Sequence, residues 1–316
     1  MVAVENEADL RVKSMDIQHP IHQLSTREEQ EFQYNPRVSC PEFEAANANH
    51  IAANARSSAR LKGRRDIAYG THPLHRLDIF PAVGAQAPVH IFIHGGYWRA
   101  QDKANYAFVA DMLVGQGITA VIINYELCPA STLGGVVASA LEGIAWVRRN
   151  IADHGGNPHN ITLSGHSAGA HLVAEALATD WSAHGIETPF ITGALAVSGI
   201  FAPYPAAHIS VNEQLRLTDE LIAIHDMERK PVLVDCPIAL AVGGLEPWHW
   251  IDQTFRYFHH LHRQGRRPDL LVANGFNHFD IQAQFIASGT AIGAACVALA
   301  HGKPVPWSGD LSRISA

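Results

Sequence analysis

The stretch NITLSGHSAGAHLVAEALATD, residues 160–180, decides the fold of this chain. Its first part is apolar and predicts a buried strand, and its last part has the apolar spacing of a helix. Between them lies GHSAG, Gly165–Gly169, a G-x-S-x-G motif. Between a strand and a helix, this motif marks a sharp turn that holds its serine above the edge of a sheet, where the helix N-terminus favours negative charge. Ser167 is therefore the candidate nucleophile.

Strands and helices alternate on both sides of this motif. Segments with helical period, such as NYAFVADMLVGQG, lie between most of the apolar runs. Apolar strands that alternate with helices indicate an α/β fold, with a mostly parallel sheet and helices on both of its faces. The runs that predict strands are residues 75–81, 89–95, 118–125, 160–166, 193–200, 236–244 and 269–275.

Two segments fall outside this alternation. Residues 1–65 are polar and irregular, apart from an Ala/Asn-rich stretch with helical character, Glu42–Arg60. We expect residues 1–65 to form an N-terminal extension that packs on the body or the cap. Residues 66–316 then form one domain, in which the proline-containing insertion at about 201–234 supplies a small substrate-covering cap.

Composition excludes some functions. The chain has 316 residues, of which 47% are hydrophobic and 17% charged, and its net charge is −7. There is no concentrated basic field, so we expect no nucleic-acid partner. The N-terminus lacks the apolar core of a secretion signal, and no apolar run reaches the length of a membrane span. We therefore expect a cytoplasmic protein without a membrane partner; its oligomeric state stays open, with a homodimer among the options.

Neither cysteines nor histidine tracts predict a metal site. The four cysteines are far apart and form no C-x-x-C pair, so we expect buried free thiols rather than a zinc site or a disulfide framework. A zinc site needs ligands that converge on a cavity, and the tract HHLH, residues 259–262, does not indicate such an arrangement. We interpret it as one face of a helix. No metal and no other cofactor is expected. The cysteines are Cys40, Cys128, Cys236 and Cys296.

A second glycine motif, HGGYW at residues 94–98, ends the apolar run that lies two strands before Ser167. An oxyanion hole in this arrangement takes one amide from the residue after the nucleophile, here Ala168, and another from a glycine-rich loop. Gly95 and Gly96 bring bare backbone N–H groups to the same sheet edge. Loss of one such donor typically costs about 3 kcal/mol of transition-state stabilisation. We predict Gly95, Gly96 and Ala168 as the oxyanion donors.

A serine nucleophile needs a base, and the base needs an acid that orients it. In this architecture the chain order is serine, acid, histidine. His278, in NGFNHFD, follows the last strand, and Glu246, in LEPWHW, follows the strand before it. Asp252 and Asp280 are rivals for the acid. Asp252 falls inside the helix expected to start near residue 250, and Asp280 is too close to His278 in sequence to orient it easily. Glu246 is preferred, and Asp252 stays open.

Aromatic residues gather around all three catalytic loops, Trp250 among them. Flat rings at this edge suit a substrate with a planar aromatic or hydrophobic part. The predicted substrate-binding residues are Tyr97, Trp98, His166, Trp248, Phe276 and Phe279.

Taken together, these motifs resemble a known family. HGGYW followed by QDKANYAF, then GHSAGAHL, VSGIF and NHFD, are similar to the serine-dependent arylformamidases, or kynurenine formamidases. These enzymes belong to the hormone-sensitive-lipase-like branch of the α/β-hydrolases. EFQYNPR and DIAYG…RLDIFP extend the resemblance to nearly the whole chain. It implies an α/β-hydrolase fold with Ser167 as nucleophile, His278 as base and the amides of Gly95 and Gly96 as oxyanion donors.

Two positions depart from the family pattern. Glu246 stands where the family usually has aspartate, and Ala202 follows SGIF where the family tends to have aspartate. The resemblance implies a serine hydrolase that cleaves a small N-acyl, formyl-type arylamide such as N-formylkynurenine through an acyl-enzyme. A carboxylesterase acting on short-chain acyl esters is the main alternative. A non-catalytic binding protein of the same fold is the third.

Overall fold

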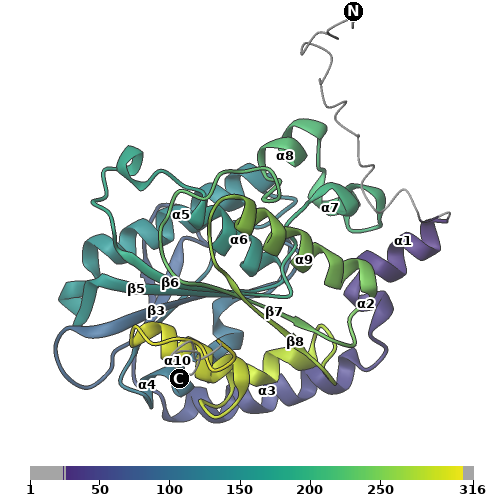
Figure 1. Cartoon of the computed structure of the whole chain (residues 1–316). Coiled ribbons are helices and arrows are strands. Elements are labelled where there is room, and N and C mark those ends of the chain that lie inside the picture. The colour runs from purple at the N-terminus through teal and green to yellow at the C-terminus, as the bar shows by residue number, and fades with distance from the viewer. Residues whose placement is uncertain (1–23, 25, 309–316) are drawn as a thin grey trace, which may run out of the picture.

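One eight-stranded sheet forms the centre of the molecule, with helices on both of its faces (Figure 1). This computed structural model describes residue 24 and residues 26–308. The order across the sheet is β1-β2-β4-β3-β5-β6-β7-β8. The strands are β1 (Arg64–Ala68), β2 (Arg76–Phe80), β3 (Ala87–Ile93), β4 (Thr119–Ile123), β5 (Gly156–His166), β6 (Ile191–Val197), β7 (Ile238–Gly243) and β8 (Asp269–Ala273).

Most of the sheet is parallel. All neighbours from β4 to β8 in this order pair parallel, whereas β2 pairs antiparallel with both β1 and β4. Every residue of β4 and β7 is buried, as expected for parallel strands covered on both faces. The predicted fold class is confirmed, and each predicted run coincides with one of β2 to β8. Sequence patterns missed β1, because its RRDIA sequence is polar and lies mostly exposed at the sheet edge.

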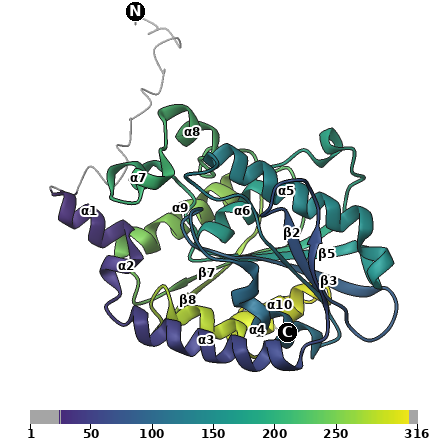
Figure 2. The ribbon, with the colours of Figure 1, turned by 180° about the vertical axis from the view of Figure 1, so that it is seen from behind.

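The helices form two layers. α5, α6 and α9 cover one face of the sheet, and α4 and α10 cover the other, with α3 packed outside α4 (Figures 1 and 2). Each face has its own apolar layer, and β3 supplies both: Ile91 and Ile93 belong to the first layer and Phe92 to the second. The bounds are α3 (Phe43–Arg60), α4 (Ala107–Val114), α5 (Leu133–Asn150), α6 (Ala168–Leu177), α9 (Trp248–Arg263) and α10 (Ala291–Ala300).

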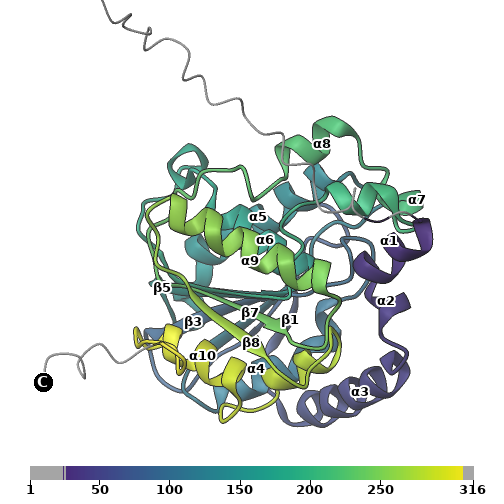
Figure 3. The same ribbon diagram turned by 45° about the vertical axis from the view of Figure 1, so that its right-hand side comes forward.

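The described part of the N-terminal extension wraps one side of this body (Figure 3). α1 (Arg27–Tyr34) packs against α9, where the buried Tyr34 hydroxyl lies 2.9 Å from His249 Nδ1. α2 (Pro36–Ser39) follows, and α3 docks on α4 through Ser57, whose hydroxyl donates to Asp111 at 2.7 Å. Residues 1–23 and 25 of the expected extension lie outside the described residues.

Residues 201–234 contain only short helices: η5 (Tyr204–His208), α7 (Asn212–Leu215) and α8 (Asp219–Ile224). η5 lies against α1, and Figure 3 shows α7 beside α1 on the same side of the molecule. Among the described helices, none is both long and apolar enough to cross a membrane. All four cysteines are free; Cys236 is half-buried and the other three are buried.

Candidate active site

The turn that carries Ser167 is built by close backbone contact. Ser167 joins β5 to α6 with φ 57° and ψ −120°, a strained conformation for a residue with a side chain. A Cβ on Gly165 would lie 2.3 Å from the carbonyl oxygen of Gly169, and one on Gly169 would lie 2.0 Å from that of Ile93. Only glycine fits at these two positions, so the motif's glycines let the turn pack directly against the end of β3.

The HGGYW loop reaches the same point. A Cβ on Gly95 would lie only 3.2 Å from Ser167 Cβ and 2.9 Å from the carbonyl oxygen of His166. Gly96 has φ 109°, and Tyr97 and Trp98 also have positive φ. The structure therefore brings Gly95 against Ser167, and Ala168 follows Ser167 as the first residue of α6. The three predicted amide donors lie on the two loops that meet here.

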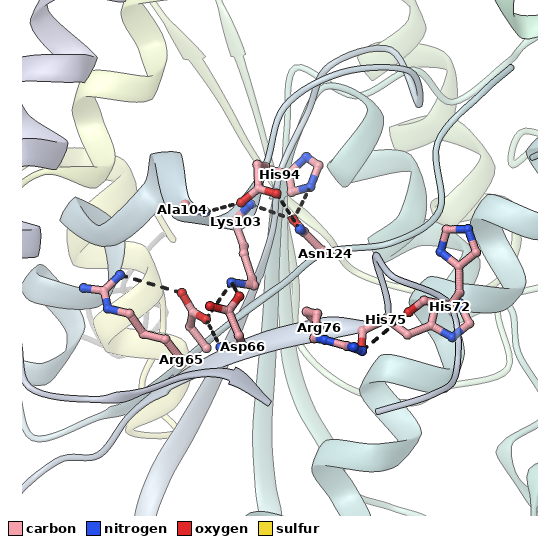
Figure 4. A network of polar contacts seen from close by, with 11 residues as sticks. Arg65, Asp66, His72, His75, Arg76, His94, Lys103, Ala104 and Asn124 are labelled. Carbon is pink, nitrogen blue, oxygen red and sulfur yellow. Dashed lines mark hydrogen bonds and ion pairs between the residues drawn. The ribbon is translucent and has the colours of Figure 1, made fainter. Parts of the chain in front are cut away.

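A buried polar network holds the carbonyl side of this loop, and Figure 4 shows its part around His94, Asn124 and Lys103. His94 Nδ1 lies 2.8 Å from the Gly95 carbonyl oxygen, and the Tyr125 hydroxyl donates to the His94 carbonyl at 2.7 Å. Asn124 Oδ1 accepts from the Lys103 amide at 2.6 Å and lies 3.2 Å from His94 Nε2. Because the peptide unit is planar, a fixed Gly95 carbonyl also fixes the direction of the Gly96 N–H.

Lys103 extends this network to the sheet edge. Its Nζ lies 2.7 Å from carboxylates of Asp66 on β1 and Asp78 on β2, and Lys103 and Asp78 are both buried. Sequence reasoning did not single out Asn124, Lys103 or Asp78. Asp78 and Asn124 are polar residues inside apolar runs, where a buried polar group must find a partner. Lys103 lies in a polar stretch of the sequence that gave no such signal.

The structure brings the predicted acid, Glu246, and the predicted base, His278, together. His278 Nδ1 lies 2.7 Å from Glu246 Oε2. The other oxygen, Oε1, accepts from the Ser198 hydroxyl at 2.5 Å and from the Gly243 amide at 2.7 Å. Both carboxylate oxygens are thus held, and the side chain is buried. This arrangement orients the ring of His278 through Nδ1 and leaves Nε2 outside the contact with Glu246.

The two rival acids have other partners. Asp252 lies within α9 and forms an ion pair with Arg256, one turn further along. Asp280 accepts from the side-chain amide of Asn277 at 2.7 Å. The structure therefore brings Glu246 to His278 and leaves Asp252 on the helix.

His278 is packed between two rings. Trp250 meets it edge to face at 4.6 Å between ring centroids, and His166 lies at 4.6 Å on another side. His166 Nε2 also lies 2.9 Å from the His278 carbonyl oxygen. Burial, with a smaller contribution from His278, holds the pKa of His166 well below its ordinary value. His166 is therefore neutral and supports the backbone of the candidate base.

A cavity of about 680 Å³ opens at Ser167 and His278. Of the predicted substrate-binding residues, Tyr97, His166 and Phe279 line it. Trp98, Trp248 and Phe276 do not line it, so the structure gives these three residues no support as substrate contacts. Trp98 is fully buried against His171, the exposed Trp248 contacts His249 with tilted rings, and Phe276 packs on the apolar layer of the α4 and α10 face. Tyr97 and Trp98 both have positive φ, and Trp248 begins α9, so proximity in sequence did not place these rings.

The sequence also predicted a cap at about residues 201–234. No residue of 201–234 lines the cavity; α2 and α3 of the N-terminal extension do, through Arg37, Phe43 and His50 among others. The segment 201–234 reaches only the rim, where Gln214 accepts from Arg99. α3 docks through polar contacts such as that of Ser57, so no apolar stripe in the sequence indicated which face of the body it would cover.

Groups that could hold a metal lie away from this cavity. One such cluster exists among the described residues: His72 and His75, from the turn between β1 and β2, with Glu126. His75 Nε2 and Glu126 form a pair at 2.9 Å, and none of the three lines the cavity (Figure 4 shows the two histidines). In the HHLH tract, His260 is buried with Nε2 at 2.6 Å from the Lys230 carbonyl, and its two neighbouring histidines of the tract at 259 and 262 are exposed.

Comparisons with known proteins agree with this architecture. The BD-FAE family model matches residues 77–194. A kynurenine formamidase of Danio rerio is 28% identical over 83% of this chain and 92% of its own length. A probable isoprenylcysteine alpha-carbonyl methylesterase of Oryza sativa is 28% identical over 70% of this chain and 58% of its own length.

Solved structures show the same fold. A putative thioesterase from Silicibacter sp. TM1040 superposes with a TM-score of 0.72 at 23% identity, over 83% of this chain and 96% of that one. An esterase of Pyrobaculum calidifontis has a TM-score of 0.63 at 18% identity, over 87% of this chain and 96% of its own. The chain is thus a hydrolase of the α/β-hydrolase superfamily, and over most of its length it is homologous to kynurenine formamidases.

Proposed function

We propose that this protein is a serine hydrolase that removes a small acyl group, formyl in the first instance, from an arylamine such as N-formylkynurenine. The observation that carries the proposal is the convergence at one cavity of Ser167 on its strained turn, Gly95 beside it, and His278 held by Glu246. The similarity to kynurenine formamidases over 83% of the chain supports the substrate class.

The residues divide the chemistry between them. Ser167 Oγ attacks the acyl carbonyl while His278 Nε2 takes its proton, and Glu246 stabilises the imidazolium through Nδ1–H. The amides of Gly95, Gly96 and Ala168 donate to the oxyanion. His278 then protonates the leaving nitrogen as the C–N bond breaks. Water, deprotonated by His278, attacks the acyl-serine ester, and the returning proton releases Ser167 and the acid.

One contact of this triad has to form during the reaction. Among the described residues, no hydrogen bond joins Ser167 Oγ to His278, although both line the cavity. Such hydrogen bonds are often long before substrate binds and tighten in the complex. We expect the acyl group, seated between Ser167 and the amides, to bring this pair into hydrogen-bond distance.

The walls of the cavity suit a flat ring. Phe43 and Phe279 meet edge to face at 4.6 Å, and Tyr97, Tyr106 and Phe108 also line the cavity. Aromatic side chains favour edge and offset contacts with another ring, and the volume is within the range of small-molecule sites. These features support an aryl rather than an alkyl leaving group.

The test is steady-state kcat/KM of the purified protein for N-formylkynurenine and for p-nitrophenyl acetate, with Ser167→Ala as control. We expect a preference for the formamide that disappears in the variant. Turnover of the ester alone would overturn the formamidase proposal and favour the carboxylesterase. Ser167 left unlabelled by a fluorophosphonate probe, with no turnover of either compound, would favour the non-catalytic binding protein.

The carboxylesterase has its own support. An isoprenylcysteine alpha-carbonyl methylesterase of Arabidopsis thaliana is 37% identical over 36% of this chain, and the same triad would hydrolyse esters. Esters are intrinsically easier to cleave than amides, so a formamidase can hydrolyse both. The ratio of the two kcat/KM values, rather than ester turnover itself, separates the two functions.

A further inference from the structure

Three side chains that can bind a metal ion meet away from the cavity. His72 and His75 stand three residues apart in the turn between β1 and β2, and Glu126 follows β4. One nitrogen of each histidine and one oxygen of the glutamate all lie within 4.8 Å of one another, and the three residues are half-buried. Two loops from neighbouring strands thus bring their donor atoms to one point. No metal was expected from the sequence, because only the fold joins these loops.

The separations between the donor atoms fit one ion. Three atoms within 4.8 Å of one another leave a point that is at most about 2.8 Å from each, whereas Zn²⁺ lies about 2.0–2.2 Å from nitrogen and carboxylate ligands. Movements of less than about 1 Å therefore bring all three atoms to bonding distance. His75 Nε2 already lies 2.9 Å from Glu126 Oε1, close to the separation of about 3.0–3.4 Å between adjacent ligand atoms of a zinc ion.

His75 is held in place by its surroundings. Its ring stacks on Tyr69 at 4.9 Å between centroids, and a Cβ on Gly70 would lie 2.3 Å from Nδ1, so the ring packs directly against the turn. The Tyr69 hydroxyl donates to the Asn124 carbonyl at 2.8 Å, which ties this turn to the strand end that leads to Glu126. A site that is largely preformed in this way loses little side-chain freedom when it binds an ion.

Two features limit the strength of the site. His72 Nδ1 accepts from the Leu74 amide at 3.1 Å, so Nε2 is the nitrogen that can bind the ion, and binding there moves the ring proton to Nδ1 and breaks this hydrogen bond. The Arg76 guanidinium donates to the His75 carbonyl at 2.9 Å, which fixes the turn but also places a positive charge beside it (Figure 4). We therefore expect micromolar rather than nanomolar affinity.

We propose that His72, His75 and Glu126 bind one divalent transition-metal ion, Zn²⁺ in the first instance, with water completing its coordination. The ion takes the place of the proton between His75 Nε2 and Glu126 Oε1. Imidazole nitrogens with one carboxylate suit zinc and its neighbours in the first transition row, whereas Mg²⁺ and Ca²⁺ prefer oxygen ligands. The ion has a structural role, because none of the three ligands lines the cavity.

The ion links the turn between β1 and β2 to a loop that supports the HGGYW segment. On one side of Glu126, the Tyr125 hydroxyl donates to the His94 carbonyl at 2.7 Å. On the other side, the Cys128 amide donates to the Trp98 carbonyl at 2.8 Å. An ion that binds the folded chain better than the unfolded chain stabilises it by mass action. Zn²⁺ should therefore raise the melting temperature as its concentration rises, and kcat/KM for whichever compound the protein hydrolyses should stay within about twofold.

Binding is measured on the untagged, full-length chain after EDTA has removed bound metals. Equilibrium dialysis against Zn²⁺ should give one ion per chain at micromolar free Zn²⁺. Co²⁺ at the same site should show the visible absorption bands of an ion bound by nitrogen and oxygen, and added Zn²⁺ should remove them. Mg²⁺ in about tenfold excess should not compete, because it prefers oxygen ligands.

Each ligand is removed in turn by His72→Gln, His75→Gln and Glu126→Gln. Each variant should bind Zn²⁺ at least about tenfold more weakly, since loss of even a supporting partner of a metal ligand has an effect of that size. The rise in melting temperature with Zn²⁺ should disappear with the binding. His259→Gln is the matched control, because His259 and His262 stand three residues apart and exposed on α9 and are the alternative pair for a surface ion. Melting curves without metal check that each variant is folded.

Two results would overturn the proposal. If Zn²⁺ binds with the same affinity and gives the same melting shift in all three ligand variants as in wild type, or does not bind at all, the cluster is only an ion pair with a neighbouring histidine. If binding is lost in His259→Gln and kept in the ligand variants, the ion belongs to α9. Should the His75 or Glu126 variants fail to fold, His72→Gln decides the question, because it leaves the pair of His75 and Glu126 intact.

Discussion

Gly169, in the first turn of α6, lies directly against Ile93, the last residue of β3: a Cβ on the glycine would come within 2.0 Å of the Ile93 carbonyl oxygen. The helix behind the candidate nucleophile and the strand that leads to the HGGYW loop therefore touch backbone to backbone. Their separation sets how far Ser167 lies from Gly95. Two short glycine motifs, more than 60 residues apart in the printed sequence, thus position each other.

Gly169→Ala should damage both stability and activity. The methyl group must displace backbone, which we expect to cost about 3 kcal/mol of unfolding free energy. A shift of the turn by about 1 Å should lower kcat/KM about 100-fold or more. Urea unfolding and steady-state kinetics measure the two effects.

A matched control for this change is Gly143→Ala, in the middle of α5. There the nearest atom to a new Cβ is 3.5 Å away, so the methyl group has room. Replacing a helical glycine where the space allows it should leave the stability unchanged or raise it by about 1 kcal/mol. Should Gly169→Ala behave like this control, the turn does not depend on the contact with Ile93.

Glu246→Gln should lower kcat by about 10³- to 10⁴-fold, as expected when the acid of a triad loses its charge while the ring it holds stays in place. The variant retains a side chain of the same length next to Ser198 and Gly243, so the fold should persist. Asp252→Asn, which removes the charge paired with Arg256, should keep most of the activity. If Asp252→Asn lowered kcat far more than Glu246→Gln, the catalytic acid would be Asp252 on α9.

Chain order explains why the contact between Glu246 and His278 could be predicted from the sequence. Once the strands were located, the order of the loops at the sheet's carboxyl edge followed. Each of these loops then offered only a few residues that could act as acid or base. Glu246 and His278 follow from that topology. The local conformation of the HGGYW loop could not be predicted in the same way. Tyr97 and Trp98 both have positive φ, and the Tyr97 ring lines the cavity whereas the Trp98 ring is buried in the core.

The cap was harder to predict for a different reason. Residues Glu42–Arg60 have helical character, and α3 spans nearly the same range. Which surface this helix covers depends on a few polar contacts with α4 and the residues before it, such as the Asn54 side chain with the Ala104 carbonyl at 2.7 Å. Hydrophobic periodicity carries no information about such contacts. The insertion after β6 was predicted as a cap because it is long. Its length did not show whether it covers the cavity or lies only at the cavity's edge.

Stability should fall as the pH is lowered below about 6.5, with buried histidines as one cause. Burial lowers the pKa of His90 to about 3, whereas an unfolded histidine titrates near 6.5. Above pH 6.5 neither state holds the proton. Below pH 6.5, His90 becomes protonated in the unfolded chain but stays neutral in the native chain. The unfolded state therefore binds more protons, and stability is lost as the pH falls from about 6.5 toward 3.

His90→Gln isolates this contribution. Glutamine can still hydrogen-bond Thr162 and Ser164, the partners of the imidazole, but it does not titrate. Between pH 7 and 5 the unfolding free energy of the variant, from urea titrations, should decline less steeply than that of wild type, by up to one proton in the slope. The exposed His159→Gln serves as the substitution control. Identical slopes for His90→Gln and wild type would show that His90 is not protected in the native state.

Ser57→Ala should weaken the packing of α3, which lines the cavity, on α4 without changing the reacting groups. The Ser57 hydroxyl donates to Asp111 on α4 at 2.7 Å and does not line the cavity. Its loss should cost about 1 kcal/mol of stability. If α3 undocks more often, KM for the aryl substrate should rise by about two- to fivefold, since 1 kcal/mol corresponds to a factor of about five, with kcat nearly unchanged.

Ser58→Ala, one residue further along α3, is the matched control. It removes a hydroxyl that makes no hydrogen bond among the described residues, and it should have no effect. A fall in kcat with constant KM in Ser57→Ala would mean that α3 positions the reacting groups themselves rather than covering the substrate.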